Sequence, residues 1–161
     1  MERVSKSLAE TEQIATDFLV DLTKQPLDHK ATIVGLVGDL GAGKTTFAQA
    51  AGRALGIKDK MASPTFVIMK SYQISYQGLT FLNTFLKDKE SPWKRLVHID
   101  CYRLDGPSDL EKLGWAELIA DPANLIFIEW PERVAKILRS NTTRINFEIT
   151  GEAERKIICD L

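Results

Sequence analysis

The stretch Gly38-Asp39-Leu40-Gly41-Ala42-Gly43-Lys44-Thr45-Thr46 decides the fold, because it fills the pattern G-x-x-x-x-G-K-[ST] of a phosphate-binding loop. The apolar run at residues 32–37 predicts a buried strand before it, and residues 45–55 predict a helix after it. A glycine-rich turn that merely begins a helix is the alternative, and the flanking strand and helix argue against it. The stretch therefore predicts a site for a nucleoside triphosphate.

Each residue type in this loop has a physical role in holding phosphate. Its glycines let successive backbone N–H groups converge on phosphate oxygens, and the following helix adds the positive end of its dipole. Lys44 is expected to reach the outer phosphates, and the Thr45 hydroxyl is expected to bind a Mg²⁺ ion that bridges two of them. The predicted nucleotide-binding residues of the loop are Gly38, Asp39, Leu40, Gly41, Ala42, Gly43, Lys44, Thr45 and Thr46.

Two later strands end in an acidic residue. Residues 96–100 end in Asp100 and residues 125–129 in Glu129, and ligands bind at this carboxyl edge in open α/β sheets. A site that hydrolyses a nucleotide needs such groups to hold magnesium and to orient water. We expect Glu129 at the metal and Asp100 at the water or completing the metal shell, although the two roles could be exchanged. Capping of the next helix is the alternative for each.

Three other polar residues lie near these segments. The Thr65 hydroxyl, in Ser63-Pro64-Thr65, could face the γ-phosphate or its metal and move after hydrolysis, or it could belong to a plain turn. His98 is expected to be packed or hydrogen-bonded rather than catalytic. Arg103 could pair with a carboxylate or sense phosphate charge, or do neither. The guanine-recognition segment Asn-Lys-x-Asp is absent from the sequence, which favours adenine.

Length and composition predict one domain over residues 1–161. Hydrophobic residues make up 44% of the chain and charged residues 27%, which is typical of a globular protein, and the net charge of -1 offers no basic field for long nucleic acid. Apolar runs fall far short of the roughly 20 residues that cross a bilayer, so a cytoplasmic protein without a membrane partner is expected. Cys101 and Cys159 are expected to be reduced, packed thiols.

Helices and strands alternate early in the chain, and strands dominate late. Together with the phosphate-binding loop, this order predicts an α/β three-layer P-loop NTPase fold, whose mostly parallel central sheet has antiparallel edge strands at the C-terminus. Residues 73–94 form either a partner-binding flap or an inserted excursion without chemistry. Helices are expected at residues 5–23, 45–55, 107–119 and 132–139, and strands at residues 32–37, 62–72, 96–100, 125–129, 143–150 and 155–159.

The motifs together resemble those of the TsaE (YjeE) family in order and spacing, over about residues 8–155. The segments that carry the resemblance are the loop at 38–46, Ser63-Pro64-Thr65-Phe66, His98-Ile99-Asp100-Cys101-Tyr102-Arg103 and Glu129-Trp130-Pro131-Glu132. The sequence departs from the family in a longer stretch, at about residues 77–93, and in Cys101, where a bulkier apolar residue is common.

The resemblance implies a small bacterial ATPase, a monomer or weak oligomer alone, that serves the synthesis of threonylcarbamoyladenosine (t6A) in tRNA. Its implied partners are TsaB and TsaD, with tRNA reached through their complex and a TsaC-type enzyme supplying the threonylcarbamoyl group. ATP hydrolysis would reset the TsaB and TsaD complex and be weak without it. The resemblance also implies that Thr11 and Arg155 contact the nucleotide, that Thr45 and Glu129 hold magnesium, and that Lys44, Asp100 and Glu129 are needed for catalysis.

Two other classes of function fit a phosphate-binding loop. A small-molecule kinase would need an acceptor pocket and an arginine-bearing lid, and the few arginines between Lys58 and Arg95 make such a lid a poor fit. A nucleotide-binding adaptor would bind without physiological hydrolysis. A phosphate-acceptor assay with nucleosides and metabolites distinguishes a kinase from an ATPase. An adaptor is distinguished by substitution of Asp100 and Glu129, which would leave its partner-stimulated turnover unchanged.

Overall fold

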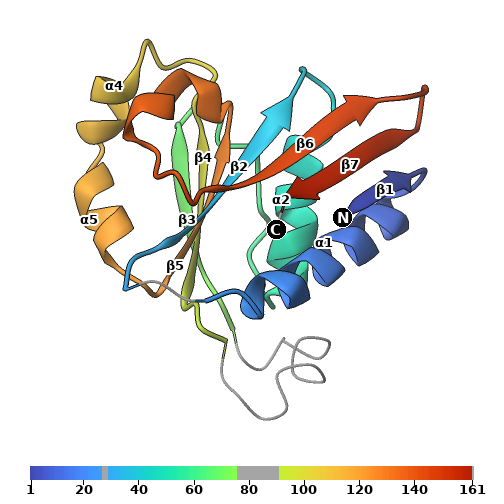
Figure 1. The fold of residues 1–161 in the computed structure, drawn as a ribbon, viewed down its shortest axis with the longest axis horizontal. Coiled ribbons are helices and arrows are strands. Elements are labelled where there is room, and N and C mark those ends of the chain that lie inside the picture. The colour runs from blue at the N-terminus through green and yellow to red at the C-terminus, as the bar shows by residue number, and fades with distance from the viewer. Residues whose placement is uncertain (27–28, 76–90, 161) are drawn as a thin grey trace.

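A computed structural model describes residues 1–26, 29–75 and 91–160 (Figure 1). The strands are β1 (Glu2–Ser5), β2 (Thr32–Gly38), β3 (Met69–Gln73), β4 (Arg95–Asp100), β5 (Asn124–Glu129), β6 (Thr143–Ile149) and β7 (Arg155–Asp160). The helices are α1 (Leu8–Thr23), α2 (Lys44–Ala54), α4 (Pro107–Glu111), α5 (Trp115–Ala120) and the 3-10 helix η2 (Pro131–Ile137).

The strands form a seven-stranded mixed sheet in the order β1-β7-β6-β2-β5-β4-β3. Its centre is parallel, because β2 pairs in parallel with β5 and β6, and β5 pairs in parallel with β4. This confirms the predicted α/β fold with a mostly parallel centre. The two C-terminal strands β6 and β7 are antiparallel to each other, as predicted. The prediction that they are edge strands was wrong, because β6 also pairs in parallel with β2, and β1 pairs antiparallel with the other side of β7.

The neighbouring strands β4 and β5 are buried on both faces, as their nearly continuous apolar sequences require. Alternate residues of β5 enter different apolar clusters, because successive side chains of a strand point to opposite faces. Leu125 and Phe127 belong to a cluster with residues of α1 and α2, while Ile126 and Ile128 belong to a cluster with residues of α4, α5 and η2.

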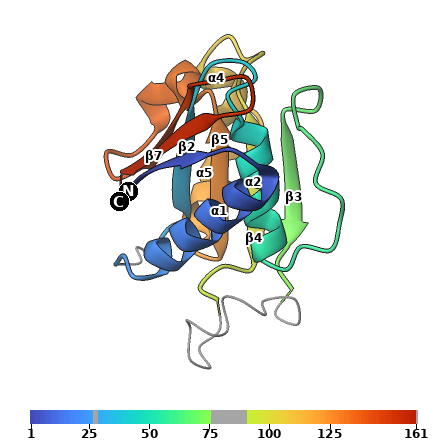
Figure 2. The ribbon, with the colours of Figure 1, turned by 90° about the vertical axis from the view of Figure 1, so that its right-hand side faces the viewer.

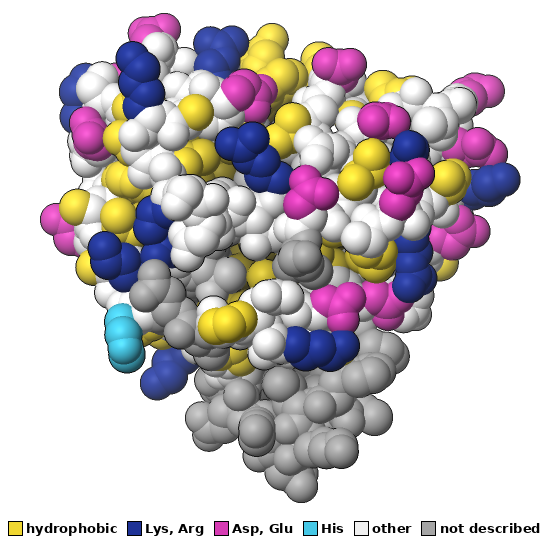
Figure 3. Space-filling view, viewed as in Figure 1, with side chains coloured by type: hydrophobic (Ala, Val, Ile, Leu, Met, Phe, Trp, Pro, Cys, Tyr) yellow, Lys and Arg dark blue, Asp and Glu magenta, His cyan; other side chains and the backbone are white. Residues whose placement is uncertain are grey.

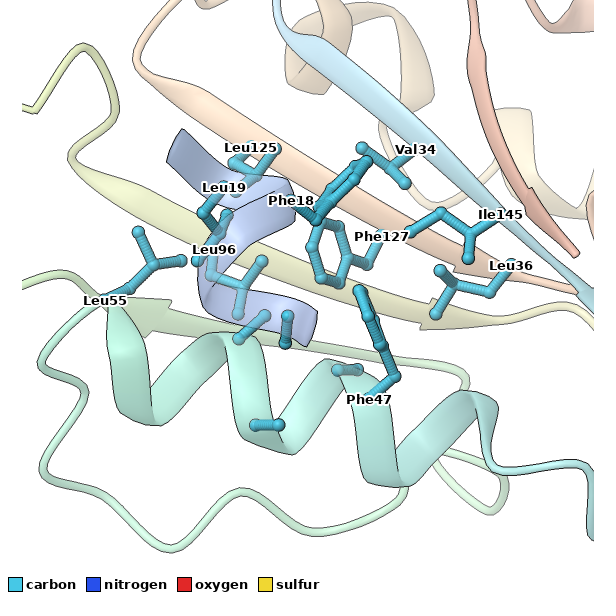
Figure 4. Packing of buried hydrophobic residues seen from close by; sticks show 14 of the residues in the cluster. Phe18, Leu19, Val34, Leu36, Phe47, Leu55, Leu96, Leu125, Phe127 and Ile145 are labelled. Atoms are coloured by element: carbon cyan, nitrogen blue, oxygen red, sulfur yellow. The ribbon is translucent and has the colours of Figure 1, made fainter. Parts of the chain in front are cut away.

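The first cluster fixes α2, and with it the phosphate-binding loop, on the sheet (Figure 4). The Phe47 ring of α2 packs edge-on against Phe18 of α1 and Phe147 of β6, with ring centroids 5.8 Å and 5.5 Å apart. Full burial of such a side chain contributes about 1.5–3 kcal/mol. Figure 2 shows α1 lying alongside α2, so both helices brace the loop from one side.

The N-terminal prediction was wrong at its start. The helix expected at residues 5–23 begins at Leu8, because the Ser7 hydroxyl accepts the N–H of Glu10 at 3.2 Å and caps it. Ser5 instead belongs to β1, a four-residue strand with no period long enough to reveal it. This strand forms because its backbone pairs antiparallel with β7, from Glu2 opposite Ile158 to Ser5 opposite Arg155.

The strand expected at residues 62–72 begins only at Met69. A turn precedes it, in which the N–H groups of Val67 and Ile68 both donate to the Pro64 carbonyl at 2.9 Å and 2.6 Å. Ile68 has a φ of 66°, a conformation that a strand excludes. The alternating residue types at 62–68 reflect this turn rather than a pleated strand.

The remaining differences concern the later helices. The helix expected at 107–119 is two short helices, α4 and α5, separated near Gly114, whose φ is 83°. The helix expected at 132–139 is the 3-10 helix η2. Of the segment 73–94, residues 76–90 lie outside the described residues, as does most of the 77–93 excursion. In the described ranges, no helix combines the length and apolar character needed to span a bilayer.

Candidate nucleotide site

The loop between β2 and α2 has a backbone that requires glycine at both ends. Gly38 has a φ of 149°, and a Cβ atom placed there would lie 2.5 Å from the carbonyl oxygen of Phe147. Gly43, the N-cap of α2, has a φ of 101° in the left-handed region. The Ala42 N–H donates to the Asp39 carbonyl at 3.1 Å, which closes the turn between them.

Lys44 is buried at the start of α2, with 4% of its surface exposed. Its Nζ donates to the carbonyls of Gly38 at 2.6 Å and Asp39 at 2.8 Å and lies 4.1 Å from the centre of the Trp130 ring. Burial lowers the pKa of Lys44, and four carboxylates oppose this shift, those of Glu129, Asp100, Glu132 and Asp39. The ammonium group is therefore held by two backbone carbonyls and lies near four carboxylates.

Thr45 and Glu129 are joined directly. The Thr45 hydroxyl donates to Oε1 of Glu129 at 2.7 Å, and Nε2 of His98 lies 2.8 Å from the same oxygen. Glu129 ends β5 and is 3% exposed, so its carboxylate is held within the sheet edge. The bond therefore places a hydroxyl and a carboxylate, two kinds of oxygen group, side by side at the start of α2.

Asp100 belongs to a separate hydrogen-bonded group. Its Oδ2 accepts the Thr65 hydroxyl at 2.5 Å, and its Oδ1 accepts the N–H of Tyr102 at 2.9 Å. The Thr65 hydroxyl also lies 2.7 Å from the Ser63 hydroxyl. Because β4 and β5 pair Asp100 with Glu129, the two carboxylates sit side by side at the strand ends.

One cavity of about 280 Å³, here called the acidic cavity, is lined by Lys44, Thr45 and Thr65 together with the two strand-end acids. It lies at the carboxyl ends of β2, β4 and β5, the edge expected for a ligand. Its lining residues are Leu40, Gly41, Gly43, Lys44, Thr45, Thr46, Thr65, Asp100, Tyr102, Glu129 and Trp130.

A second cavity of about 350 Å³, here called the α1 cavity, shares Gly41, Gly43 and Thr46 with the first. Thr11 lines it and has its hydroxyl 2.7 Å from that of Ser5. Its other lining residues are Ser5, Lys6, Ser7, Leu8, Ala42, Phe147, Ala153, Arg155 and Ile157.

Arg155, at the start of β7, ties the loop to the β6–β7 turn. Its Nε donates to the Gly41 carbonyl at 3.3 Å, and its guanidinium also donates to the carbonyls of Gly151, Glu152 and Glu154. Every predicted site residue except Gly38 and Asp39 thus lines one of the two cavities, and those two hold the Lys44 ammonium through their carbonyls.

Sequence reasoning gave no role to Trp130 and Tyr102, which line the acidic cavity with their rings 5.3 Å apart. The signal that could have found them is their position, one and two residues after the strand-ending acids Glu129 and Asp100. The Arg103 guanidinium lies over the Phe66 ring, at 4.8 Å from its centre. His98 is hydrogen-bonded inside the sheet, as expected.

A family model described as threonylcarbamoyl adenosine biosynthesis protein TsaE matches residues 5–157. The chain belongs to the TsaE family. A relative from Treponema pallidum (strain Nichols) is 31% identical over 129 residues, which are 80% of this chain and 82% of the relative. One from Rickettsia bellii (strain RML369-C) is 27% identical over 161 residues, 99% and 93% of the two chains. Both are named tRNA threonylcarbamoyladenosine biosynthesis protein TsaE.

A solved structure agrees with this membership of the TsaE family. The crystal structure of Bacillus subtilis YdiB superposes with a TM-score of 0.63 and 25% sequence identity, over 98% of this chain and 82% of that one. The resemblance to the TsaE family inferred from four short segments is therefore confirmed over most of the chain, and with it a place among proteins of tRNA threonylcarbamoyladenosine biosynthesis.

Proposed function

We propose that this TsaE family member binds and hydrolyses ATP, with Mg²⁺, as a subunit required for t6A modification of tRNA. The observation that carries the proposal is the acidic cavity, where a buried lysine, a hydroxyl and two strand-end carboxylates meet at a glycine-rich loop. Positioning and electrostatic stabilisation supply most of the catalysis in phosphoryl transfer. These residues are the ones that such catalysis needs.

The loop fits a polyphosphate. Its bend at Gly43 lies at the N-terminus of α2, where backbone N–H groups without helical partners and the helix dipole favour an anion. Lys44 would exchange its contacts to the Gly38 and Asp39 carbonyls for phosphate oxygens. The α1 cavity, with Thr11 and Arg155, is proposed to hold the sugar and base, and adenine is the proposed base.

The acidic cavity also fits Mg²⁺. This ion prefers oxygen ligands and keeps several waters and phosphate oxygens, so a hydroxyl and one carboxylate suffice on the protein side. Thr45 and Glu129 supply these two groups, and within the described ranges no cluster of three His, Cys, Asp or Glu residues forms a cage suited to another metal. When bound, the ion would neutralise charge that develops on the phosphates.

Asp100 is the proposed group that orients the attacking water. Its carboxylate accepts hydrogen bonds from the Thr65 hydroxyl and the Tyr102 N–H. It lies beside Glu129, which is the residue that accepts the Thr45 hydroxyl. The Thr65 hydroxyl would face the γ-phosphate or its metal and would change position after hydrolysis, which would move the turn at residues 64–68. This division of roles follows the hydrogen bonds, which link Glu129 and not Asp100 to the loop.

TsaB and TsaD are the proposed partners, and ATP hydrolysis would reset their complex. Contact with tRNA is proposed to go through that complex, since Lys and Arg side chains are interspersed with Asp and Glu on the face shown in Figure 3 and the net charge is -1. A role in tRNA modification also supports a cytoplasmic location. We further propose one P-loop ATPase domain over residues 1–161, of three-layer architecture, that is a monomer or weak oligomer alone.

The experiment is ATP hydrolysis by the chain alone and with TsaB, TsaD and tRNA. The proposal expects slow release of phosphate alone and faster release with the partners, while the Lys44→Ala variant shows neither. Transfer of the γ-phosphate to a nucleoside or metabolite in an acceptor panel would instead indicate a kinase. Nucleotide binding with no partner-stimulated release would indicate an adaptor.

A further inference from the structure

His98 is a fully buried polar residue to which the proposed function gives no role. It lies in β4, two positions before Asp100, and its exposed fraction is 0%. Its Nε2 is 2.8 Å from Oε1 of Glu129 on the adjacent strand β5. Its Nδ1 is buried and has no hydrogen-bond partner in the part of the chain that the structure describes.

This geometry fixes which ring nitrogen carries the proton. A carboxylate oxygen only accepts hydrogen bonds, so the short contact requires a proton on Nε2. Burial of Nδ1 without a hydrogen-bond partner costs free energy, because the atom loses its hydrogen bonds to water. An apolar side chain at this position would avoid that cost. The histidine is therefore explained by its single bond to Glu129 rather than by packing.

Oε1 of Glu129 receives two donors from two different elements. The Thr45 hydroxyl donates from α2 and the His98 ring from β4. Two donors on one oxygen fix the rotation of the carboxylate, and in residues 1–26, 29–75 and 91–160 no hydrogen bond is made to Oε2. The second oxygen is thus left for a ligand.

We propose that His98 is a positioning residue, which holds the Glu129 carboxylate in the orientation that presents Oε2 to the metal shell. The inference rests on the proposed function, because it assumes that Glu129 serves a Mg²⁺ ion. Loss of a residue that orients a metal ligand typically lowers metal affinity by about 10- to 100-fold. A histidine that only fills the core would leave metal affinity unchanged.

The first test needs neither nucleotide nor metal. The chain has two histidines, so the His29→Gln variant identifies the ring signals of His98 in ¹⁵N-labelled protein. The inference expects a proton on Nε2 of His98 in the wild-type protein. A ring whose Nε2 carries no proton would overturn it.

The second test measures ADP affinity by calorimetry, in EDTA and over a range of Mg²⁺ concentrations. His98→Leu keeps an apolar strand but removes the donor, and His98→Gln places an amide N–H near the Nε2 position. We expect His98→Leu to need roughly 10- to 100-fold more Mg²⁺ for the same gain in affinity, with unchanged affinity in EDTA. His98→Gln should recover part of the loss, and His29→Gln should match the wild type.

The outcomes separate this inference from the proposed function. If the wild type gains affinity with Mg²⁺ and His98→Leu gains it equally, the positioning role is overturned while the function stands. If the wild type itself gains nothing from Mg²⁺, both are overturned. Thermal unfolding of each variant checks that it folds. If His98→Leu does not fold, the ¹⁵N spectrum of the His98 ring in the wild-type protein still tests the proposed geometry.

Discussion

The Thr45 hydroxyl donates a 2.7 Å hydrogen bond to Oε1 of Glu129, a residue 84 positions later in the chain. The sheet creates this contact, because β2 leads into the loop and pairs in parallel with β5, opposite Glu129 at Leu36. The first turn of α2 and the end of β5 therefore meet at one place. The bond brings together the hydroxyl and the carboxylate that are proposed to hold a divalent cation.

Glu129→Gln and Asp100→Asn should fail in different ways. Glu129→Gln removes the charge beside Thr45, so it should weaken nucleotide binding in Mg²⁺ but not in EDTA. Asp100→Asn keeps the shape of the Thr65 contact and should bind nucleotide normally, yet lose about 100-fold or more in partner-stimulated turnover. Calorimetry and phosphate release on both variants check this. The reverse pattern would show that the two roles are exchanged.

Lys44→Ala should weaken nucleotide binding strongly. The ammonium is the charged donor closest to the loop carbonyls, and a hydrogen bond to a charged group contributes about 1.5–3 kcal/mol, so ATP affinity should fall by roughly 10- to 100-fold or more. Lys58→Ala, at an exposed lysine outside both cavities, is the matched control. Unaltered ATP affinity with normal stimulated hydrolysis in Lys44→Ala would reject the prediction.

Gly38→Ala should destabilise the fold even without nucleotide. The new Cβ would lie 2.5 Å from the Phe147 carbonyl oxygen, at a φ of 149°, and such overpacking costs about 1–3 kcal/mol. Gly106→Ala is the control, because nothing lies within 4 Å of its added Cβ and its φ of 169° is extended. Urea unfolding measures both, and equal midpoints would contradict this account of the loop.

The two thiols should be unreactive in the native protein. Burial raises the pKa of Cys101 to about 12 and that of Cys159 to about 11, from an ordinary value of 9.0. A thiol reagent at pH 8 should modify both cysteines in urea and neither in buffer. Rapid modification of the native protein would contradict the burial of these side chains.

The same pKa shifts give a pH dependence of stability. Above pH 9 the unfolded thiols lose their protons while the native ones keep them up to about pH 11 and 12. The unfolded state then binds fewer protons, so the free energy of unfolding falls as pH rises in this range. A variant with Cys101→Ala and Cys159→Ala should show a shallower fall, measured by urea unfolding at pH 8 to 10.

The sequence predicted the elements whose local signals were strong. The main site residues follow from local patterns alone, namely the order of strand, loop and helix around Lys44 and the acids that end β4 and β5. The signals of β1 were too weak, because four residues carry no readable period and the strand depends on an edge formed by β7, at the other end of the chain.

Long-range geometry limited the prediction of the site. The alternating residues before Met69 suggested a strand, and only the φ of Ile68 and the two bonds to the Pro64 carbonyl reveal the turn that brings Thr65 to Asp100. Likewise, nothing local to His98 indicates its contact with Glu129, because the register of β4 on β5 creates it.

The central claim is that a polyphosphate tail binds the loop at residues 38–46, with a divalent cation between Thr45 and Glu129. Its most direct test is a crystal structure of the chain with Mg²⁺ and a non-hydrolysable ATP analogue. The account predicts phosphate density against the backbone N–H groups of this loop and Nζ of Lys44, with the cation beside the Thr45 hydroxyl. A tail bound elsewhere, or an empty acidic cavity at saturating nucleotide, would contradict it.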